Sequence, residues 1–176
     1  MDNKFKITKP IRLIELFAGY GSQALALKYL GVPFEHWKIS EWAVKSIQAY
    51  KDLHFFDDNT DYSEQLTVQE IRARLYGKIS SDYVKPMSDE RINRMAEKRL
   101  RTIYNNMQAT HNLGSICTVK GSDLQITETD EYCYILTYSF PCQDLSVAGK
   151  GAGMAKDSGT RSGLLWEVER LLTECG

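Results

Sequence analysis

The sequence predicts an α/β domain that is built on a parallel sheet and contains a helical insertion. Two apolar runs, at residues 11–17 and 132–138, have the pattern of buried strands, and each precedes a segment with helical spacing. A glycine turn after the first run begins a strand–helix–strand–helix series. The chain has 176 residues, which is the length of one domain with one buried core.

The first strand and helix are predicted at the amino end of the chain. Residues 11–17 form a compact apolar run that Arg12 and Glu15 interrupt. The run ends in the turn 18–22, after which apolar residues recur with helical spacing as far as residue 30.

A second strand and helix follow directly. Gly31 and Pro33 end the first helix, because a glycine and then a proline commonly follow the last helical residue. Residues 34–39 then predict a second strand, and residues 41–50 have helical spacing.

The carboxyl half returns to the same alternation. Residues 132–138 predict a buried strand, which leads into a corner at residues 139–142. Residues 162–172 have the pattern of an amphipathic helix.

Residues 54–114 predict a helical insertion between these halves. Thr67 and Glu70 form a capping-box pair that begins a short helix, and Gly77 can end it. Ser88 is a plausible N-cap for a longer helix that reaches about residue 108. We expect this insertion to lie on the surface and to be dispensable for ligand binding.

The insertion is also the basic part of a nearly neutral chain. Residues 70–101 contain nine basic and five acidic residues, whereas the whole chain has a net charge of −1. A solvated surface is the simpler interpretation of this charge. The alternative is a face that contacts phosphates through Arg94, Lys98 and Arg101.

Composition excludes several classes of protein. A net charge of −1 argues against binding nucleic acid through bulk charge, and no apolar run reaches the ~20 residues that span a bilayer. The first ten residues lack the apolar stretch of a secretory signal, so we expect no membrane and a cytoplasmic protein. The cysteines and histidines have no metal-ligand spacing, which predicts no metal and no disulfide framework. Cys117, Cys133 and Cys175 are expected to be small buried apolar residues.

The first turn predicts an adenosine-containing ligand. A glycine turn after a strand lets backbone N–H groups approach a ligand, and an acidic residue about 20 positions later can bind ribose hydroxyls. Glu41 lies 20 positions after Gly21. Ala24 stands where dinucleotide enzymes often have a third glycine, and alanine is tolerated there. The turn therefore does not exclude a nicotinamide cofactor.

Cys142 is a candidate nucleophile. It follows a predicted strand at the edge where open α/β sheets bind ligands, and a glycine-rich loop comes directly after it. Such a loop can close over a substrate and exclude water.

Four segments, taken in order, resemble motifs of the cytosine-5 DNA methyltransferases. They are Phe17-Ala18-Gly19-Tyr20-Gly21-Ser22, Glu41-Trp42, Gly121-Ser122-Asp123-Leu124 and Phe140-Pro141-Cys142-Gln143. The resemblance implies a Rossmann-like fold that uses S-adenosyl-L-methionine as cofactor and double-stranded DNA as substrate. Insertion 54–114 matches nothing in the minimal core of that family.

The resemblance also implies roles for individual residues. Phe17 would pack on the adenine of the cofactor, Glu41 would bind the ribose hydroxyls, and Trp42 would stack on the adenine. Asp123 would accept from the exocyclic amine of adenine. The full set of implied cofactor-binding residues is Phe17, Ala18, Gly19, Tyr20, Gly21, Ser22, Glu41, Trp42, Asp123, Leu124 and Phe140.

The implied chemistry centres on the fourth segment, which contains Cys142. Cys142 would add to carbon 6 of a cytosine that has been flipped out of the helix, and Pro141 and Gln143 would shape its loop. Ser146, Lys150 and Arg161 are candidates for contacts with DNA.

One part of the family pattern is absent. The family has a Glu-Asn-Val motif whose acid protonates cytosine, and the sequence contains no such motif. We therefore expect an incomplete enzyme, whose carboxyl-terminal part lies in the same chain or in a second chain. The alternative is an inactive methyltransferase-like module that acts through binding or interaction.

Overall fold

The computed structural model describes residues 6–140, 156 and 162–175. Its centre is a parallel sheet that has three strands within these residues, in the order β2-β1-β3. The strands are β1 (Ile11–Leu16), β2 (Glu35–Ser40) and β3 (Cys133–Tyr138). The predicted α/β class and parallel sheet are confirmed.

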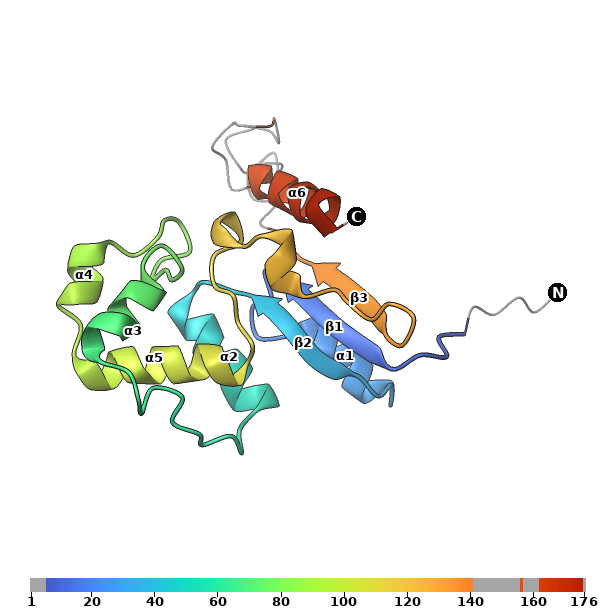
Figure 1. Cartoon of the computed structure of the whole chain (residues 1–176), viewed down its shortest axis with the longest axis horizontal. Helices are drawn as coiled ribbons and strands as arrows, with labels where there is room; N and C mark the ends of the chain where they lie inside the picture. Colours follow the sequence, from blue (N-terminus) through green and yellow to red (C-terminus); the bar gives the residue numbers. More distant parts are fainter. Residues whose placement is uncertain (1–5, 141–155, 157–161, 176) are drawn as a thin grey trace.

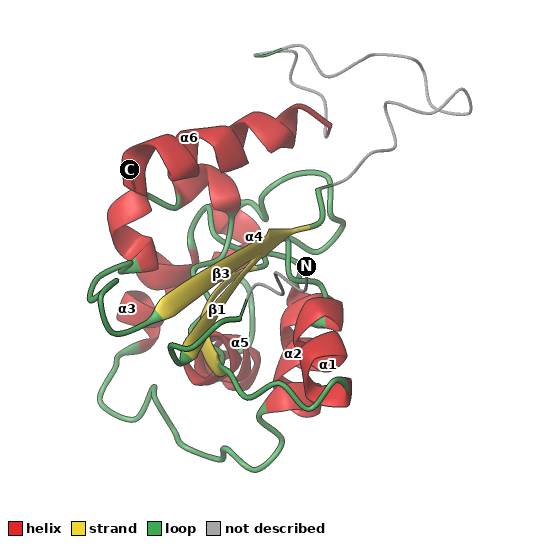
Figure 2. Ribbon diagram, turned by 90° about the vertical axis from the view of Figure 1, so that its right-hand side faces the viewer, coloured by secondary structure: helices red, strands yellow, loops and turns green. Residues whose placement is uncertain are grey.

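The central strand β1 is buried along its whole length because helices cover both of its faces (Figure 2). Ile14 and Leu16 pack in one core cluster with helix α6 (Leu165–Cys175). Glu15 points to the other face, where helices α1 (Ser22–Tyr29) and α2 (Val44–His54) lie. A central strand between two helical layers has few exposed positions, which explains the nearly continuous apolar run.

Arg12 and Glu15, the two residues that interrupt this run, are both buried and both paired. The guanidinium of Arg12 lies 3.8 Å from the ring centroid of Trp37 and 3.4 Å from that of Tyr132. It also forms an ion pair of 3.0 Å with Glu35. These contacts lie at the amino end of the sheet and provide partners for a buried charge.

The insertion folds as a helical layer with its own core beside α2 (Figure 1). Its helices are α3 (Val68–Leu75), α4 (Asp89–Asn93) and α5 (Glu97–Ala109). Their buried side chains pack around Ile47 of α2, so the insertion is anchored to the sheet domain through that helix.

The helix boundaries that we predicted in the insertion are partly confirmed. The capping box of Thr67 and Glu70 is present, and Gly77 has a left-handed φ of 70° just beyond α3. Ser88 caps α4, but the prediction of one helix to residue 108 is wrong because the chain turns at residues 94–96. This break allows both Ile92 and Leu100 to be fully buried in the core of the insertion.

The segment between α5 and β3 consists of turns and two short 3-10 helices, η1 (Ile116–Thr118) and η2 (Gly121–Leu124). The indole N–H of Trp37 donates to the carbonyl of Leu124 at 2.9 Å and holds η2 against the sheet. Cys117 is exposed on η1, so the expectation that it is buried is wrong, and Cys133 and Cys175 are only partly buried. No helix in the described part of the chain is long and apolar enough to cross a membrane.

Candidate functional site

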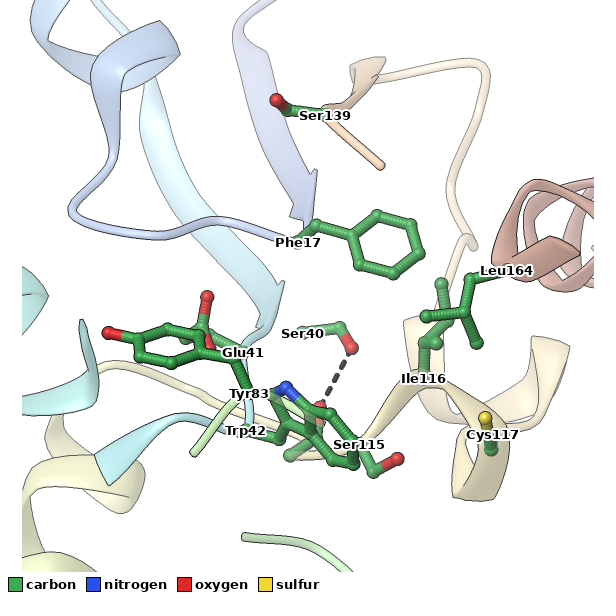
Figure 3. A pocket seen from close by; sticks show the side chains of 11 residues that line it. Phe17, Ser40, Glu41, Trp42, Tyr83, Ser115, Ile116, Cys117, Ser139 and Leu164 are labelled. Atoms are coloured by element: carbon green, nitrogen blue, oxygen red, sulfur yellow. Dashed lines mark hydrogen bonds between the residues drawn. The ribbon is translucent and has the colours of Figure 1, made fainter. Parts of the chain in front are cut away.

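A cavity of about 180 Å³ lies at the carboxyl ends of the three strands (Figure 3). The strand order reverses at β1, and this is the place where open α/β sheets bind ligands. The lining residues come from the ends of all three strands, the insertion, the segment after α5 and the start of α6: Phe17, Ser40, Glu41, Trp42, Tyr83, Gly114, Ser115, Ile116, Cys117, Ser139 and Leu164.

Glu41 supplies a buried carboxylate at this cavity. Its side chain holds two backbone groups, because Oε2 accepts from the N–H of Gly19 at 2.9 Å and Oε1 accepts from that of Ala43 at 2.6 Å. Burial raises the pKa of Glu41, and the backbone N–H groups oppose that shift. The carboxylate therefore ties the glycine turn after β1 to the start of α2.

Asn112 and Ser40 fix the main chain around Glu41. The amide of Asn112 donates to the carbonyl of Glu41 at 2.9 Å, and its Oδ1 accepts from the N–H groups of Glu41 and Gly114. The hydroxyl of Ser40 donates to the carbonyl of Gly114 at 2.8 Å. Sequence reasoning missed both residues, since a lone asparagine and a lone serine carry no motif.

The residue before the glycine turn, Phe17, has a strained backbone. Phe17 has a φ of 55°, a left-handed conformation that is uncommon for residues other than glycine, and its ring lies at the cavity. Gly21 is also left-handed, and a Cβ there would lie 2.7 Å from Cε2 of Tyr50 and would overlap His54. Only glycine fits that position without displacing α2.

The structure brings together part of the predicted cofactor site. Phe17, Glu41 and Trp42 line the cavity, and the turn 18–22 lies beside it, with Ala18 and Gly21 buried and the side chain of Tyr20 exposed. Phe140 stacks on Tyr138 with a centroid distance of 6.5 Å and is not among the lining residues.

Asp123 and Leu124 do not line this cavity. Asp123 is exposed on η2, where its carboxylate accepts from the backbone N–H of Lys120 at 2.9 Å. Leu124 is fully buried in the core beneath α6. The segment from Gly114 to Cys117 lies at the cavity instead, and its Gly-Ser pair was a signal that sequence reasoning did not use.

The remaining candidate residues lie outside the part of the chain that the structure describes. They are Pro141, Cys142, Gln143, Ser146, Lys150 and Arg161. Within the described ranges, no group of three His, Cys, Asp or Glu side chains is placed to hold a metal ion.

Comparison with known proteins identifies the family of the chain. The family model of the C-5 cytosine-specific DNA methylases matches residues 83–175, more than half of the chain. The chain belongs to this family.

Two curated relatives are similar along most of the chain. The orphan methyltransferase M.SssI of Spiroplasma monobiae is 38% identical over 168 residues, which cover 94% of this chain and 42% of the relative. The type II methyltransferase M2.ScrFI of Lactococcus lactis subsp. cremoris is 35% identical over 164 residues, which cover 92% of this chain and 43% of the relative. The chain thus spans about two fifths of the length of these relatives.

Proposed function

We propose that this chain is the part of a bacterial, cytoplasmic DNA (cytosine-5)-methyltransferase that binds S-adenosyl-L-methionine and carries the nucleophile. The observation that carries the proposal is the cavity at the carboxyl edge of the sheet, where Phe17 and Trp42 lie with the buried carboxylate of Glu41. Membership of the methylase family and the two similar methyltransferases support the reaction class.

The residues around the cavity fit an adenosyl group. Phe17 and Trp42 offer flat apolar surfaces on which an adenine ring can stack. The oxygens of Glu41 accept from the backbone N–H groups of Gly19 and Ala43, and a carboxylate has about four acceptor positions, so some are left for the ribose hydroxyls. Residues 18–22 would contact the methionine part. When bound, S-adenosyl-L-methionine supplies a methyl group on a positively charged sulfur.

The polar edge of the adenine site is assigned to the segment after α5. Gly114, Ser115 and Ile116 line the cavity, whereas Asp123 is exposed on η2. We therefore assign to Ser115 the contact with adenine that the resemblance gave to Asp123.

Cys142 is proposed as the nucleophile, in a loop that Pro141 and Gln143 shape. Its thiolate adds to carbon 6 of cytosine, and the electron pair that this releases makes carbon 5 nucleophilic enough to accept a methyl group. Loss of the proton from carbon 5 then expels the thiolate and restores the ring. The sequence contains no Glu-Asn-Val, so we assign the proton donor for cytosine N3 to the part of the enzyme that corresponds to the unmatched part of the relatives.

Double-stranded DNA is the proposed substrate of the whole enzyme. The target cytosine must leave the helix to reach a thiolate, which costs a few kcal/mol of unstacking and unpairing. Ser146, Lys150 and Arg161 are proposed to contact DNA around the loop of Cys142. Because the chain spans 42% and 43% of the two relatives, methylation is assigned to this chain together with a complementary part.

Covalent trapping tests this assignment. The chain is combined with the part of the Spiroplasma relative that it does not match, and is incubated with S-adenosyl-L-methionine and DNA that contains 5-fluorocytosine. Fluorine at carbon 5 cannot leave as a cation, so the thiolate adduct persists and a protein–DNA band survives denaturation.

The matched control is a second cysteine of the same chain. Cys142→Ser should abolish the band, and Cys133→Ser, at the start of β3, should retain it. A band that persists in Cys142→Ser would show that another residue is the nucleophile. Absence of any band from the unmodified pair would argue for the inactive binding module.

A further inference from the structure

One loop of the insertion contacts the segment that follows strand β2. Residues 80–87 connect the turn after α3 to α4, and the loop docks on the chain directly after Glu41. The N–H of Ser80 donates to the carbonyl of Trp42 at 2.7 Å, and the N–H of Val44 donates to the carbonyl of Ser80 at 3.0 Å. The insertion is therefore joined by backbone hydrogen bonds to the segment that carries the candidate site.

The loop is organised by its own side chains. Ser80 is fully buried, and its hydroxyl donates to the carbonyl of Lys85 at 2.7 Å and accepts from the N–H of Tyr83 at 3.2 Å. Asp82 accepts from the N–H of Val84 at 2.9 Å and from that of Lys85 at 3.2 Å. These bonds lower the pKa of Asp82. A loop with this many internal bonds holds its tip in one conformation.

Tyr83, at the tip of the loop, has a backbone conformation that its residue type disfavours. Its φ is 62°, in the left-handed region that normally takes glycine or asparagine. The side chain is 43% exposed, so burial in a core does not offset the strain. Its hydroxyl lies 3.1 Å from the hydroxyl of Ser46 on α2, which anchors the ring beside the cavity. Strain of this kind gathers at ligand sites.

The cavity thus has two aromatic residues with left-handed backbones. Phe17 follows β1 with a φ of 55°, and Tyr83 comes from the insertion with a φ of 62°. Both line the same cavity as Trp42 and Glu41, although 66 positions separate them in the sequence (Figure 3). Two unrelated segments are held in a disfavoured conformation, and each presents an aromatic ring to one cavity.

We infer that Tyr83 is a binding residue for the nucleoside part of the methyl donor, so that the insertion forms one wall of the cofactor site. The phenol ring covers the apolar face of a bound nucleoside and excludes water from the carboxylate of Glu41. This inference rests on the proposed function, and it replaces the expectation that the insertion is dispensable for ligand binding.

Chemical protection in the unmodified chain gives the first test. Exposed tyrosines react with a nitrating reagent, and Tyr62, which is 40% exposed in the same insertion, is an internal control. With saturating S-adenosyl-L-methionine, nitration of Tyr83 should fall several-fold and that of Tyr62 should not change. Equal nitration of Tyr83 with and without bound ligand would overturn the inference.

Two glycine substitutions separate binding from folding. Tyr83→Gly removes the ring and relieves the left-handed strain, so the melting temperature should be retained or raised while the Kd for S-adenosyl-L-methionine rises at least about tenfold. Gln125→Gly relieves a φ of 50° beyond η2 and should leave the Kd unchanged. Tyr83→Phe keeps the ring and should bind within about threefold of the unmodified chain.

The outcomes distinguish this inference from the proposed function. If the unmodified chain fails to bind S-adenosyl-L-methionine, the proposed function is wrong and the inference falls with it. If the unmodified chain binds and Tyr83→Gly binds equally well, the inference alone is wrong. Should Tyr83→Gly fold poorly, the nitration experiment decides, because it uses the unmodified chain.

Discussion

The hydroxyl of Tyr50 donates a hydrogen bond of 2.6 Å to Oε2 of Glu15, and both residues are buried between β1 and α2. The other oxygen of Glu15 accepts from the N–H of Ala24 at 3.2 Å, in the first turn of α1. Gly21, the N-cap of α1, has no side chain that could make this bond. Glu15 therefore caps the helix from the neighbouring strand, and Tyr50 stabilises that carboxylate.

Tyr50→Phe should lower the stability of the fold because Oε2 of the buried Glu15 loses its hydroxyl donor. Such a loss costs about 1–3 kcal/mol, which corresponds to roughly 2–4 °C of melting temperature for each kcal/mol in a chain of this size. Thermal unfolding followed by circular dichroism measures it. Tyr62→Phe, which removes an exposed hydroxyl bonded to Asp58, should change the melting temperature little. Similar losses in the two variants would contradict the role given to Glu15.

Gly21→Ala should destabilise the chain more than Gly31→Ala does. Both glycines are left-handed, with φ of 82° and 68°, so both substitutions carry about 1–2 kcal/mol of backbone strain. At Gly31 an added Cβ meets nothing within 4 Å, whereas at Gly21 it meets Tyr50 and His54. The difference in urea unfolding between the two variants isolates the steric part. Equal destabilisation would mean that the side chains of Tyr50 and His54 can move aside without loss of unfolding free energy.

Acid should remove a stabilising contribution that His36 makes. Burial chiefly, with His54, Lys28 and His111 nearby, lowers the pKa of His36 from 6.5 to about 3. Its Nδ1 lies 2.9 Å from the hydroxyl of Tyr50. Between these two pH values the unfolded chain binds a proton that the folded chain excludes, so this contribution is complete above pH 6.5 and is lost as the pH falls towards 3.

The variant His36→Asn isolates this effect from other groups. Glu15 and Glu41, whose pKa values are raised by burial, act in the opposite direction and are present in both proteins. The difference in unfolding free energy between the two proteins should therefore shrink from pH 7 to pH 5. A constant difference over that range would show that His36 is protonated equally in both states.

Arg101 should prove structural, unlike its basic neighbours on the insertion. Its guanidinium donates to the carbonyls of Ser63 and Leu66 at 2.7 and 3.2 Å and pairs with Glu97. Arg101→Ala should lower the melting temperature by several degrees, because two backbone acceptors lose a charged donor. Arg94→Ala, at an exposed position, should have little effect on it.

If basic residues of the insertion contact DNA phosphates, their substitution should change the salt dependence of DNA binding and not the melting temperature. Each lost phosphate contact lowers the slope of log binding constant against log salt concentration by about 0.9, and Arg94 and Lys98 are the exposed candidates.

The structural role of Arg101 would be contradicted if Arg101→Ala and Arg94→Ala had the same melting temperature.

The sheet and its helices were predictable because their signals are local. The apolar run of β1 and the capping box of Thr67 need no knowledge of distant residues. The break between α4 and α5 was not predictable, since no glycine or proline marks it and the burial of Ile92 and Leu100 decides it.

Some residues of the candidate site were likewise predictable from local sequence, and others were not. Phe17, Glu41 and Trp42 lie next to a glycine turn or a strand end, so motif and spacing located them. Tyr83 reaches the cavity through a backbone conformation that a tyrosine does not signal. Asn112 is placed by long-range hydrogen bonds that sequence spacing does not report.

Calorimetric titration of the 176-residue chain tests the central claim, that the cavity beside Glu41 binds S-adenosyl-L-methionine. We expect saturable binding of one molecule per chain and no binding of a nicotinamide dinucleotide. Glu41→Gln should weaken binding about tenfold to a hundredfold, because a charge-assisted hydrogen bond contributes about 1.5–3 kcal/mol, while Glu35→Gln at the far end of β2 should bind normally. No binding of S-adenosyl-L-methionine, or equal affinity in Glu41→Gln and the unmodified chain, would contradict the claim.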